Sequence, residues 1–201
     1  MQMAITASLV KELREKTGVG MMRCKKALQD VDGDLGAAEK LMRTQGVAVA
    51  AKKSSRATGE GQIGTYIHTG GKIGVLVEVN CETDFAARSD AFQELVKSLA
   101  MHVAASAPRF LNREDVSEEL LAEEREIARE QAKKSGKPEK ILDRIVEGKM
   151  EKFYSENVLL EQPFVKDPEK TVGQLITEAI GRIGENIRLR RFARFVLGDE
   201  V

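Results

Sequence analysis

The sequence has 201 residues, and its 32 lysine and arginine residues balance 32 aspartate and glutamate residues. This neutral balance argues against a general affinity for nucleic acid or for an anionic membrane surface. Charged residues make up 32% and aromatic residues 4% of the sequence, which is typical of a helix-rich protein with much solvated helix surface.

Three short helices are predicted at the start of the chain. The expected ranges are Thr6 to Lys16, Met21 to Val31, and a third helix that begins after the N-cap residue Asp34 and ends at Gly46. The second helix has a clean apolar stripe at the spacing i, i+3, i+4, i+7, formed by Cys24, Ala27, Leu28 and Val31. We expect these helices to form a small bundle of marginal core size.

The bend Gly18-Val19-Gly20 separates the first two helices and leads into Met21 and Met22. The residues alone leave two interpretations of these methionines open. General burial tendency favours packing in the core. The flexible, polarizable methionine side chain also suits an adaptable contact surface.

After the third helix the sequence becomes rich in Lys, Ser and Gly, from Lys52 to Gly61. This composition predicts a helical tail and then a flexible linker, across which the bundle can move. We therefore place a three-helix domain at residues 1–55, a linker up to about residue 61 and a core domain at residues 62–201.

A β-hairpin is predicted next, because Gln62 to His68 and Lys72 to Asn80 alternate apolar with polar or small residues around the turn Thr69-Gly70-Gly71. An amphipathic helix from about Ser89 to Ala105 would cover its apolar face. A third strand is expected near the C-terminus, from Asn186 to Leu197.

The junction between the hairpin and this helix is unusual. It reads Asn80-Cys81-Glu82-Thr83-Asp84-Phe85-Ala86-Ala87-Arg88 and contains no glycine or proline. One interpretation is local: Thr83 caps the helix, Asp84 complements its dipole and Phe85 lies under it. The other is that a rigid corner presents a carboxylate and an aromatic ring to a partner.

Two charged segments, Glu114 to Lys134 and Glu139 to Glu156, carry narrow apolar seams and are joined by Ser135-Gly136-Lys137-Pro138. They predict an antiparallel helical hairpin, a coiled coil over about residues 114–157, that projects from the body. An extended piece, Gln162 to Val165, and a helix that begins at Thr171 and ends at Gly184 complete the chain. The expected fold class is α+β, with a three-helix bundle and a three-stranded antiparallel sheet packed with helices.

The sequence contains no convincing catalytic or metal-binding motif. Gly59-Glu60-Gly61-Gln62-Ile63-Gly64 precedes a predicted strand instead of opening a helix, so we reject it as a dinucleotide site. His102 has no metal ligands at a suitable spacing, and packing is the commoner role for a lone histidine. Paired catalytic carboxylates stay open, since acidic residues occur throughout, but we expect no enzyme, cofactor or metal.

Three features of the sequence indicate where the protein acts. No apolar run approaches the length that spans a bilayer, and the first residues lack the regions of a signal peptide. Cys24 and Cys81 are expected to be free buried thiols in a reducing compartment. We therefore expect a cytoplasmic protein without membrane contact.

From end to end the sequence resembles the elongation factor Ts family. The resemblance is highly specific because many ordered blocks carry it. These blocks are Ser8 to Gly18, Gly20-Met21-Met22, Cys24 to Leu28, Glu78 to Phe85, Met101 to Ala105, Gly136-Lys137-Pro138, Gln162 to Val165 and Lys170 to Leu175.

The resemblance implies a guanine-nucleotide exchange factor that binds elongation factor Tu, GDP-bound or nucleotide-free, disturbs its magnesium site and promotes GDP release. It implies that the first domain is a UBA-like, partner-binding bundle, which favours the contact role of the methionines. The implied contact residues are Thr83, Asp84, Phe85 and Ala86 beside the magnesium site of the partner, and Met21, Met22, Arg14, Val19 and His102 elsewhere.

Long members of the family carry two copies of the hairpin-plus-helix unit, whereas this chain carries one. A homodimer would restore the missing half, and the exposed sheet edge motivates that hypothesis. The alternative function is an RNA- or ribosome-binding adaptor that uses Lys52, Lys53, Arg56 and the strand from Arg188 to Arg194. The neutral charge and the lack of aromatic stacking platforms weigh against direct nucleic-acid binding.

Overall fold

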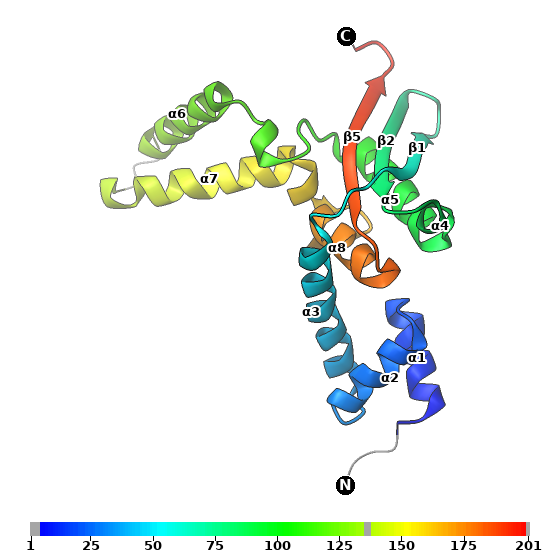
Figure 1. Ribbon diagram of the computed structural model, residues 1–201. Helices are drawn as coiled ribbons and strands as arrows, with labels where there is room; N and C mark the ends of the chain where they lie inside the picture. Colours follow the sequence, from blue (N-terminus) through cyan, green and yellow to red (C-terminus); the bar gives the residue numbers. More distant parts are fainter. Residues whose placement is uncertain (1–4, 135–137, 200–201) are drawn as a thin grey trace. The chain divides into compact units, whose positions relative to one another are not determined.

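The computed structural model describes residues 5–134 and 138–199 (Figure 1). It confirms the α+β class. By contacts the chain divides into two compact units, each assembled from separate stretches of sequence. The first unit takes in the residues up to Gly64 together with Val77–Ser98 and Leu175–Arg190, and the second takes in Thr65–Leu76, Leu99–Gln174 and the residues from Arg191 onward.

The first unit begins with the predicted bundle. The side chains of Thr6 and Asp34 accept hydrogen bonds from the N–H groups of Leu9 and Ala37, so each caps a helix as its chemistry favours. The apolar stripes meet in one core around Leu13, Cys24 and Leu28. The helices are α1 Ala7–Thr17, α2 Met21–Asp30 and α3 Leu35–Lys53.

The prediction that the third helix ends at Gly46 is wrong, because α3 continues to Lys53. Gly46 is buried in the middle of the helix, next to Gly181 of α8 (Val172–Ile183). A glycine that ends a helix and a glycine that lets two backbones approach closely look alike in the sequence.

The predicted hairpin and third strand form a three-stranded sheet in the order β1-β2-β5. The glycines of the rejected dinucleotide motif have structural roles. A Cβ atom on Gly64 would lie 2.1 Å from Cγ1 of Val96 in the covering helix, and one on Gly61 would lie 2.2 Å from the carbonyl oxygen of Val79. The elements are β1 Glu60–Ile67, β2 Ile73–Cys81, α4 Asp84–Arg88, α5 Asp90–Ser106 and β5 Ile187–Val196.

The second unit contains the predicted helical hairpin, α6 Glu118–Lys134 and α7 Leu142–Asn157. Its helices share a buried seam that includes Ala128, Val146 and Met150. Exposed ion pairs such as Arg125–Glu147 link the two helices outside the seam. Most of the predicted connection, residues 135–137, lies outside the described residues.

A second, two-stranded sheet was not predicted. It pairs β3 Pro163–Phe164 with β4 Asp167–Thr171 in antiparallel fashion. Three short 3₁₀ helices also lie in the second unit, at Arg113–Asp115, Glu139–Ile141 and Leu159–Glu161.

Candidate partner-binding site

The corner between β2 and α4 exposes an aromatic ring. Thr83 is in the extended conformation and caps α4, because its Oγ1 accepts a 3.3 Å hydrogen bond from the N–H of Ala86. Ala86 and Ala87 point into the core, so the helix places Phe85 on the outside, with 81% of the residue exposed. The interpretation in which Phe85 lies under the helix is therefore wrong, while the capping role of Thr83 is confirmed.

Asp84 begins the same helix, and its carboxylate accepts a hydrogen bond from the guanidinium of Arg88 one turn later. Both side chains are substantially exposed. Exposed ion pairs of this kind contribute only about 0–1 kcal/mol to stability. Asp84 can therefore exchange Arg88 for another cationic or hydrogen-bonding partner at little cost.

Two glutamates hold the corner from both sides. The carboxylate of Glu185 accepts the N–H of Thr83 at 3.0 Å and its hydroxyl at 2.7 Å. In the opposite direction, the carboxylate of Glu82 accepts the N–H of Asn186 at 2.6 Å. We call this pair of contacts the carboxylate clasp. Sequence reasoning missed it, because Thr83 and Glu185 are 102 positions apart and neither belongs to a local motif that points to the other.

The thiol of Cys81 completes the corner. It is buried and donates a 3.1 Å hydrogen bond to the carbonyl oxygen of Thr83. Burial raises the pKa of the Cys81 thiol, and the negative charge of Glu185 acts in the same direction. The thiol therefore stays protonated and keeps its role as a hydrogen-bond donor.

The methionine corner of the bundle is a second exposed apolar surface. Gly18 ends α1 in the left-handed conformation, at φ 65°, and Gly20 precedes α2. Between them Val19 turns into the bundle core, whereas Met21 and Met22 are 50% and 77% exposed. The core packing that burial tendency favours for the methionines is thus wrong, and Val19 is the buried member of this bend.

The other residues implied by the family resemblance differ in their accessibility. Arg14 is exposed on α1. His102 is fully buried in the second unit, so it offers no surface to a partner in this conformation. Among the described residues, the exposed members of the implied set are Arg14, Met21, Met22, Thr83 and Phe85, with Asp84 partly exposed.

His102 is instead part of a buried hydrogen-bond network. Its Nδ1 accepts the N–H of Val165 at 3.1 Å, and its Nε2 therefore donates to Oε1 of Gln162 at 2.9 Å. The amide nitrogen of Gln162 donates in turn to the carbonyls of Ser106 and Glu156, at 3.2 and 2.7 Å. Burial lowers the pKa of His102, partly offset by the hydrogen bond to Gln162, so the ring is neutral at pH 7.

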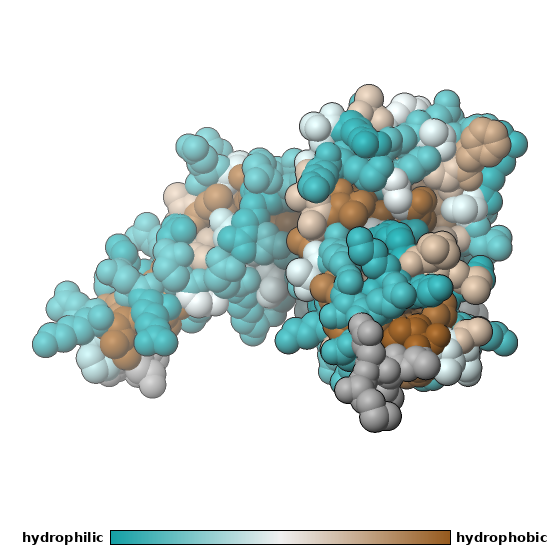
Figure 2. Space-filling view, turned by 60° about the horizontal axis from the view of Figure 1, so that its bottom comes forward, coloured by the Kyte–Doolittle hydropathy of each residue, from teal (hydrophilic) through white to brown (hydrophobic). Residues whose placement is uncertain are grey.

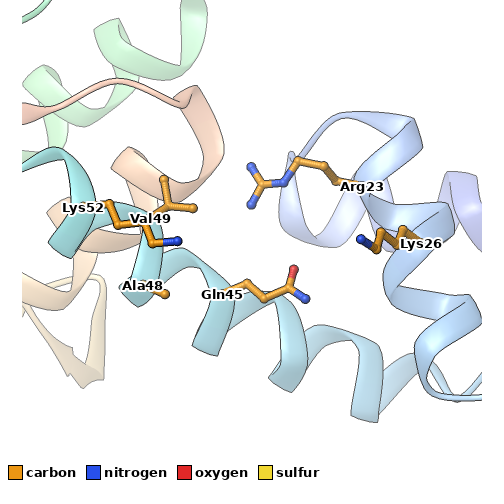
Figure 3. Close-up of a pocket in the computed structure, with 6 residues that line it drawn as sticks. All are labelled: Arg23, Lys26, Gln45, Ala48, Val49 and Lys52. Atoms are coloured by element: carbon orange, nitrogen blue, oxygen red, sulfur yellow. The ribbon is translucent and has the colours of Figure 1, made fainter.

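A groove of about 380 Å³ lies between α2 and α3 in the first unit. Arg23 and Lys26 face it from α2 (Figure 3), and Gln45, Ala48, Val49 and Lys52 line it from α3. Three of these side chains are cationic and none is acidic, so this lining cannot supply carboxylate chemistry. The guanidinium of Arg23 donates to the carbonyl oxygen of Gly181 at 2.7 Å, which leaves it less available to a ligand.

The cations proposed for RNA binding are largely engaged within the chain. Lys53 and Arg56 pair with Glu82, at 3.7 and 3.1 Å. Arg190 pairs with Glu78, and Arg188 donates to the carbonyl oxygen of Ser54. These bonds weaken the case for a continuous phosphate-binding surface.

The visible face in Figure 2 is mainly hydrophilic, with apolar side chains in limited patches between charged ones. Within residues 5–134 and 138–199, no group of three or more His, Cys, Asp or Glu side chains could hold a metal ion. No helix in these ranges is both long and apolar enough to cross a membrane. The arrangement of exposed Phe85, Asp84 and the two methionines is suited to contact with another macromolecule.

Comparison with known proteins gives consistent matches. Residues 36–180 match the protein family described as Elongation factor TS. A protein of Geobacter sulfurreducens named Elongation factor Ts is 58% identical over 197 residues, which cover 98% of this chain and 91% of the relative. Proteins of the same name from Anaeromyxobacter sp. and Thermosipho melanesiensis are 58% and 56% identical over 97% of this chain, and over 89% and 100% of their own lengths.

Proposed function

This chain belongs to the elongation factor Ts family, and we propose that it is a guanine-nucleotide exchange factor that binds elongation factor Tu and promotes the release of GDP. The observation that carries the proposal is the exposed Asp84-Phe85 corner, within a segment that resembles the family's contact segment. Because the relatives are bacterial, we place this exchange in the cytoplasm.

Exchange of this kind breaks no covalent bond, so it requires no catalytic residue, cofactor or metal in this chain. A factor that binds nucleotide-free elongation factor Tu more tightly than the GDP-bound form must weaken GDP binding by the same factor. The contacts that matter are therefore those that only the nucleotide-free partner can make. GTP then binds the emptied site and displaces the factor.

We assign the disturbance of the partner's magnesium site to Asp84 and Phe85. Phe85 is the larger apolar group, and its 81% exposure leaves it free to enter a pocket on the partner. Asp84 lies next to it in the same turn of helix and accepts a hydrogen bond from Arg88, through an exposed contact that is easily exchanged. The ring and the carboxylate therefore reach the partner together.

We assign the initial attachment to the methionine corner. Exposed methionines at the end of a helix form an adaptable apolar contact, which a flexible side chain can fit to the surface of the nucleotide-binding domain. Arg14 is exposed on the same bundle. His102 is buried, and its ring holds the backbone at Val165 instead of contacting the partner.

We further propose that two copies of the chain associate through the face of the sheet that α5 leaves uncovered. In the second unit this face exposes Ile67 and Leu76, while Phe195 and Leu197 are exposed on and just after β5. These four apolar side chains are 43–76% exposed, and a second copy would bury them.

The direct test of the proposed function uses purified elongation factor Tu loaded with fluorescent GDP. Addition of this chain together with excess unlabelled GDP is expected to accelerate the loss of fluorescence in proportion to the amount of factor, until saturation. A heat-denatured sample of the chain is the control. Release at the spontaneous rate with the folded chain would reject the exchange function, and steep salt-dependent binding to RNA would instead favour the adaptor.

A further inference from the structure

The carboxylate clasp has an unusual geometry for a helix cap. Glu185 binds both donors of a single residue, because its two oxygens accept the N–H and the hydroxyl of Thr83. A hydroxyl has only one hydrogen, so the bond to Glu185 leaves the oxygen lone pairs of Thr83 to accept the N–H of Ala86. The glutamate thus orients the cap that begins α4.

The second half of the clasp ties the corner to the end of α3. Glu82 binds the N–H of Asn186 and also pairs with Arg56 and Lys53. The side-chain amide of Asn186, which is buried, donates to the carbonyl oxygens of Arg56 and Ser54, at 2.8 and 3.4 Å. All of these residues belong to the first unit. Three segments that are distant in the sequence are therefore joined at this point.

The helix that carries Phe85 needs such support. The α4 helix has only five residues, too few for an isolated helix to be stable in water. The exposed ring of Phe85 cannot hold it in place, because most of that ring has no contact in the free chain. The buried side chains of Ala86 and Ala87 anchor one side, and the clasp fixes the end at which the helix begins.

We propose that Glu185 is a positioning residue for exchange: by binding Thr83 twice it holds Asp84 and Phe85 in the orientation that disturbs the partner's magnesium site. This proposal rests on the proposed exchange function. In this role Glu185 acts through Thr83 and not by contact with the nucleotide. Its loss lets the corner adopt several orientations, of which only some fit the partner.

Loss of Glu185 should affect the orientation of the Asp84-Phe85 corner but not the attachment of the factor to its partner. Glu185→Ala removes both acceptors of Thr83 and leaves the methionine corner untouched. The saturating rate of GDP release is then expected to fall by about tenfold or more, since misplacement of the groups that must fit the partner commonly costs this much. The factor concentration at half-saturation should change by less than about threefold, because attachment through Met21 and Met22 persists.

Two further variants make the test decisive. Glu185→Gln keeps one acceptor oxygen of similar shape, so its saturating rate should lie between those of the parent and Glu185→Ala. Glu169→Ala, on exposed β4 and outside the clasp, should keep the parent rate. Circular dichroism melts of each variant show that the assay temperature lies below unfolding, and hydrogen exchange at Ala86 should be faster in Glu185→Ala.

The double variant Asp84→Ala with Phe85→Ala separates this proposal from the proposed function. If that variant is slow and Glu185→Ala runs at the parent saturating rate, the positioning role is rejected and the exchange function stands. If the double variant also runs at the parent rate, the exchange role of the corner is rejected, and the positioning role of Glu185 is rejected with it. A fall in the saturating rate of folded Glu185→Ala and Glu185→Gln, in that order of severity, supports the proposal.

Discussion

Gly181 of α8 lies so close to Gly46 of α3 that a Cβ atom added to Gly181 would be 2.8 Å from the Cα of Gly46. The reverse substitution has more room, because a Cβ on Gly46 would lie 3.8 Å from the Cα of Gly181. This contact, together with the bond from Arg23 to the carbonyl of Gly181, joins the bundle to α8 within the first unit.

The asymmetry of this contact predicts opposite results for two alanine variants. Gly181→Ala should lower the free energy of unfolding by about 1–3 kcal/mol, because its methyl group would clash with the backbone of Gly46, which cannot move away as a side chain can. Gly46→Ala should be neutral or should stabilise the chain by up to about 1 kcal/mol, through the higher helix propensity of alanine. Urea unfolding followed by circular dichroism measures both, and equal effects of the two variants would contradict the close approach.

The methionine corner predicts a change in affinity without a change in maximal rate. Replacement of Met21 and Met22 by alanine should raise the factor concentration at half-saturation by about tenfold, the effect of losing a modest hot spot. The rate at saturation should stay close to that of the parent. Ile127→Ala, which removes an exposed apolar side chain on α6, is the control and should alter neither quantity. A fall in the maximal rate of the methionine variant would show that the corner does more than attach.

Buried His102 predicts a loss of stability on the acid side of neutrality. Its pKa is lowered in the folded chain from an ordinary value of 6.5, chiefly by burial. Below pH 6.5, His102 binds a proton in the unfolded chain but stays neutral in the folded chain, until the pH reaches its lower folded pKa. The stability contributed by neutral His102 is therefore complete above pH 6.5 and declines as the pH falls through that window.

Urea unfolding at pH 7.5 and at pH 5.5 checks this dependence. The free energy of unfolding of the parent should be lower at pH 5.5 than at pH 7.5. His102→Gln should be less stable than the parent at both pH values, but its stability should differ less between them, because it has no ring to protonate. His68→Gln is the control, since His68 is exposed and lies outside the buried network. An unchanged difference between the two pH values in His102→Gln would refute the assignment.

The exposed apolar face of the sheet predicts a dimer that a charged substitution on this face should dissociate. Leu197→Glu would place a charge on an apolar surface that a second copy buries, and association should weaken by at least about tenfold. Sedimentation velocity should show a dimer for the parent and a monomer for the variant at the same concentration. A parent that sediments as a monomer at micromolar concentration, while it accelerates exchange fully, would count against association.

Local patterns in the sequence predicted most of the secondary structure. The hairpin was predictable from the alternation in β2, where Val75, Val77 and Val79 are buried and Leu76 is exposed. The strand β4 was not, because Asp167–Thr171 has no apolar alternation and is held by pairing with β3. The prediction that the helix ends at Gly46 was wrong because the residue that Gly46 packs against, Gly181, is distant in the sequence.

The candidate site shows the same limit. The position of a strand-to-helix corner and the cap at Thr83 follow from neighbouring residues, and both are present. Thr83 caps the separate five-residue helix α4, however, and not the longer helix that was expected from about Ser89. Whether Phe85 and the methionines are exposed depends on which neighbouring side chains occupy the core. Val19 and Ala86 occupy it in the folded chain, which leaves the larger side chains outside. The clasp from Glu185 required the folded arrangement of two segments, which no local spacing encodes.

The central claim is that Asp84 and Phe85 bring about nucleotide release, and one stopped-flow measurement tests it directly. Fluorescent GDP release from elongation factor Tu is measured at saturating concentrations of the parent and of the folded double variant Asp84→Ala with Phe85→Ala. We predict that the variant still binds through its methionine corner but releases GDP at least about tenfold more slowly than the parent. Release at the parent rate by the folded, bound variant would contradict the claim.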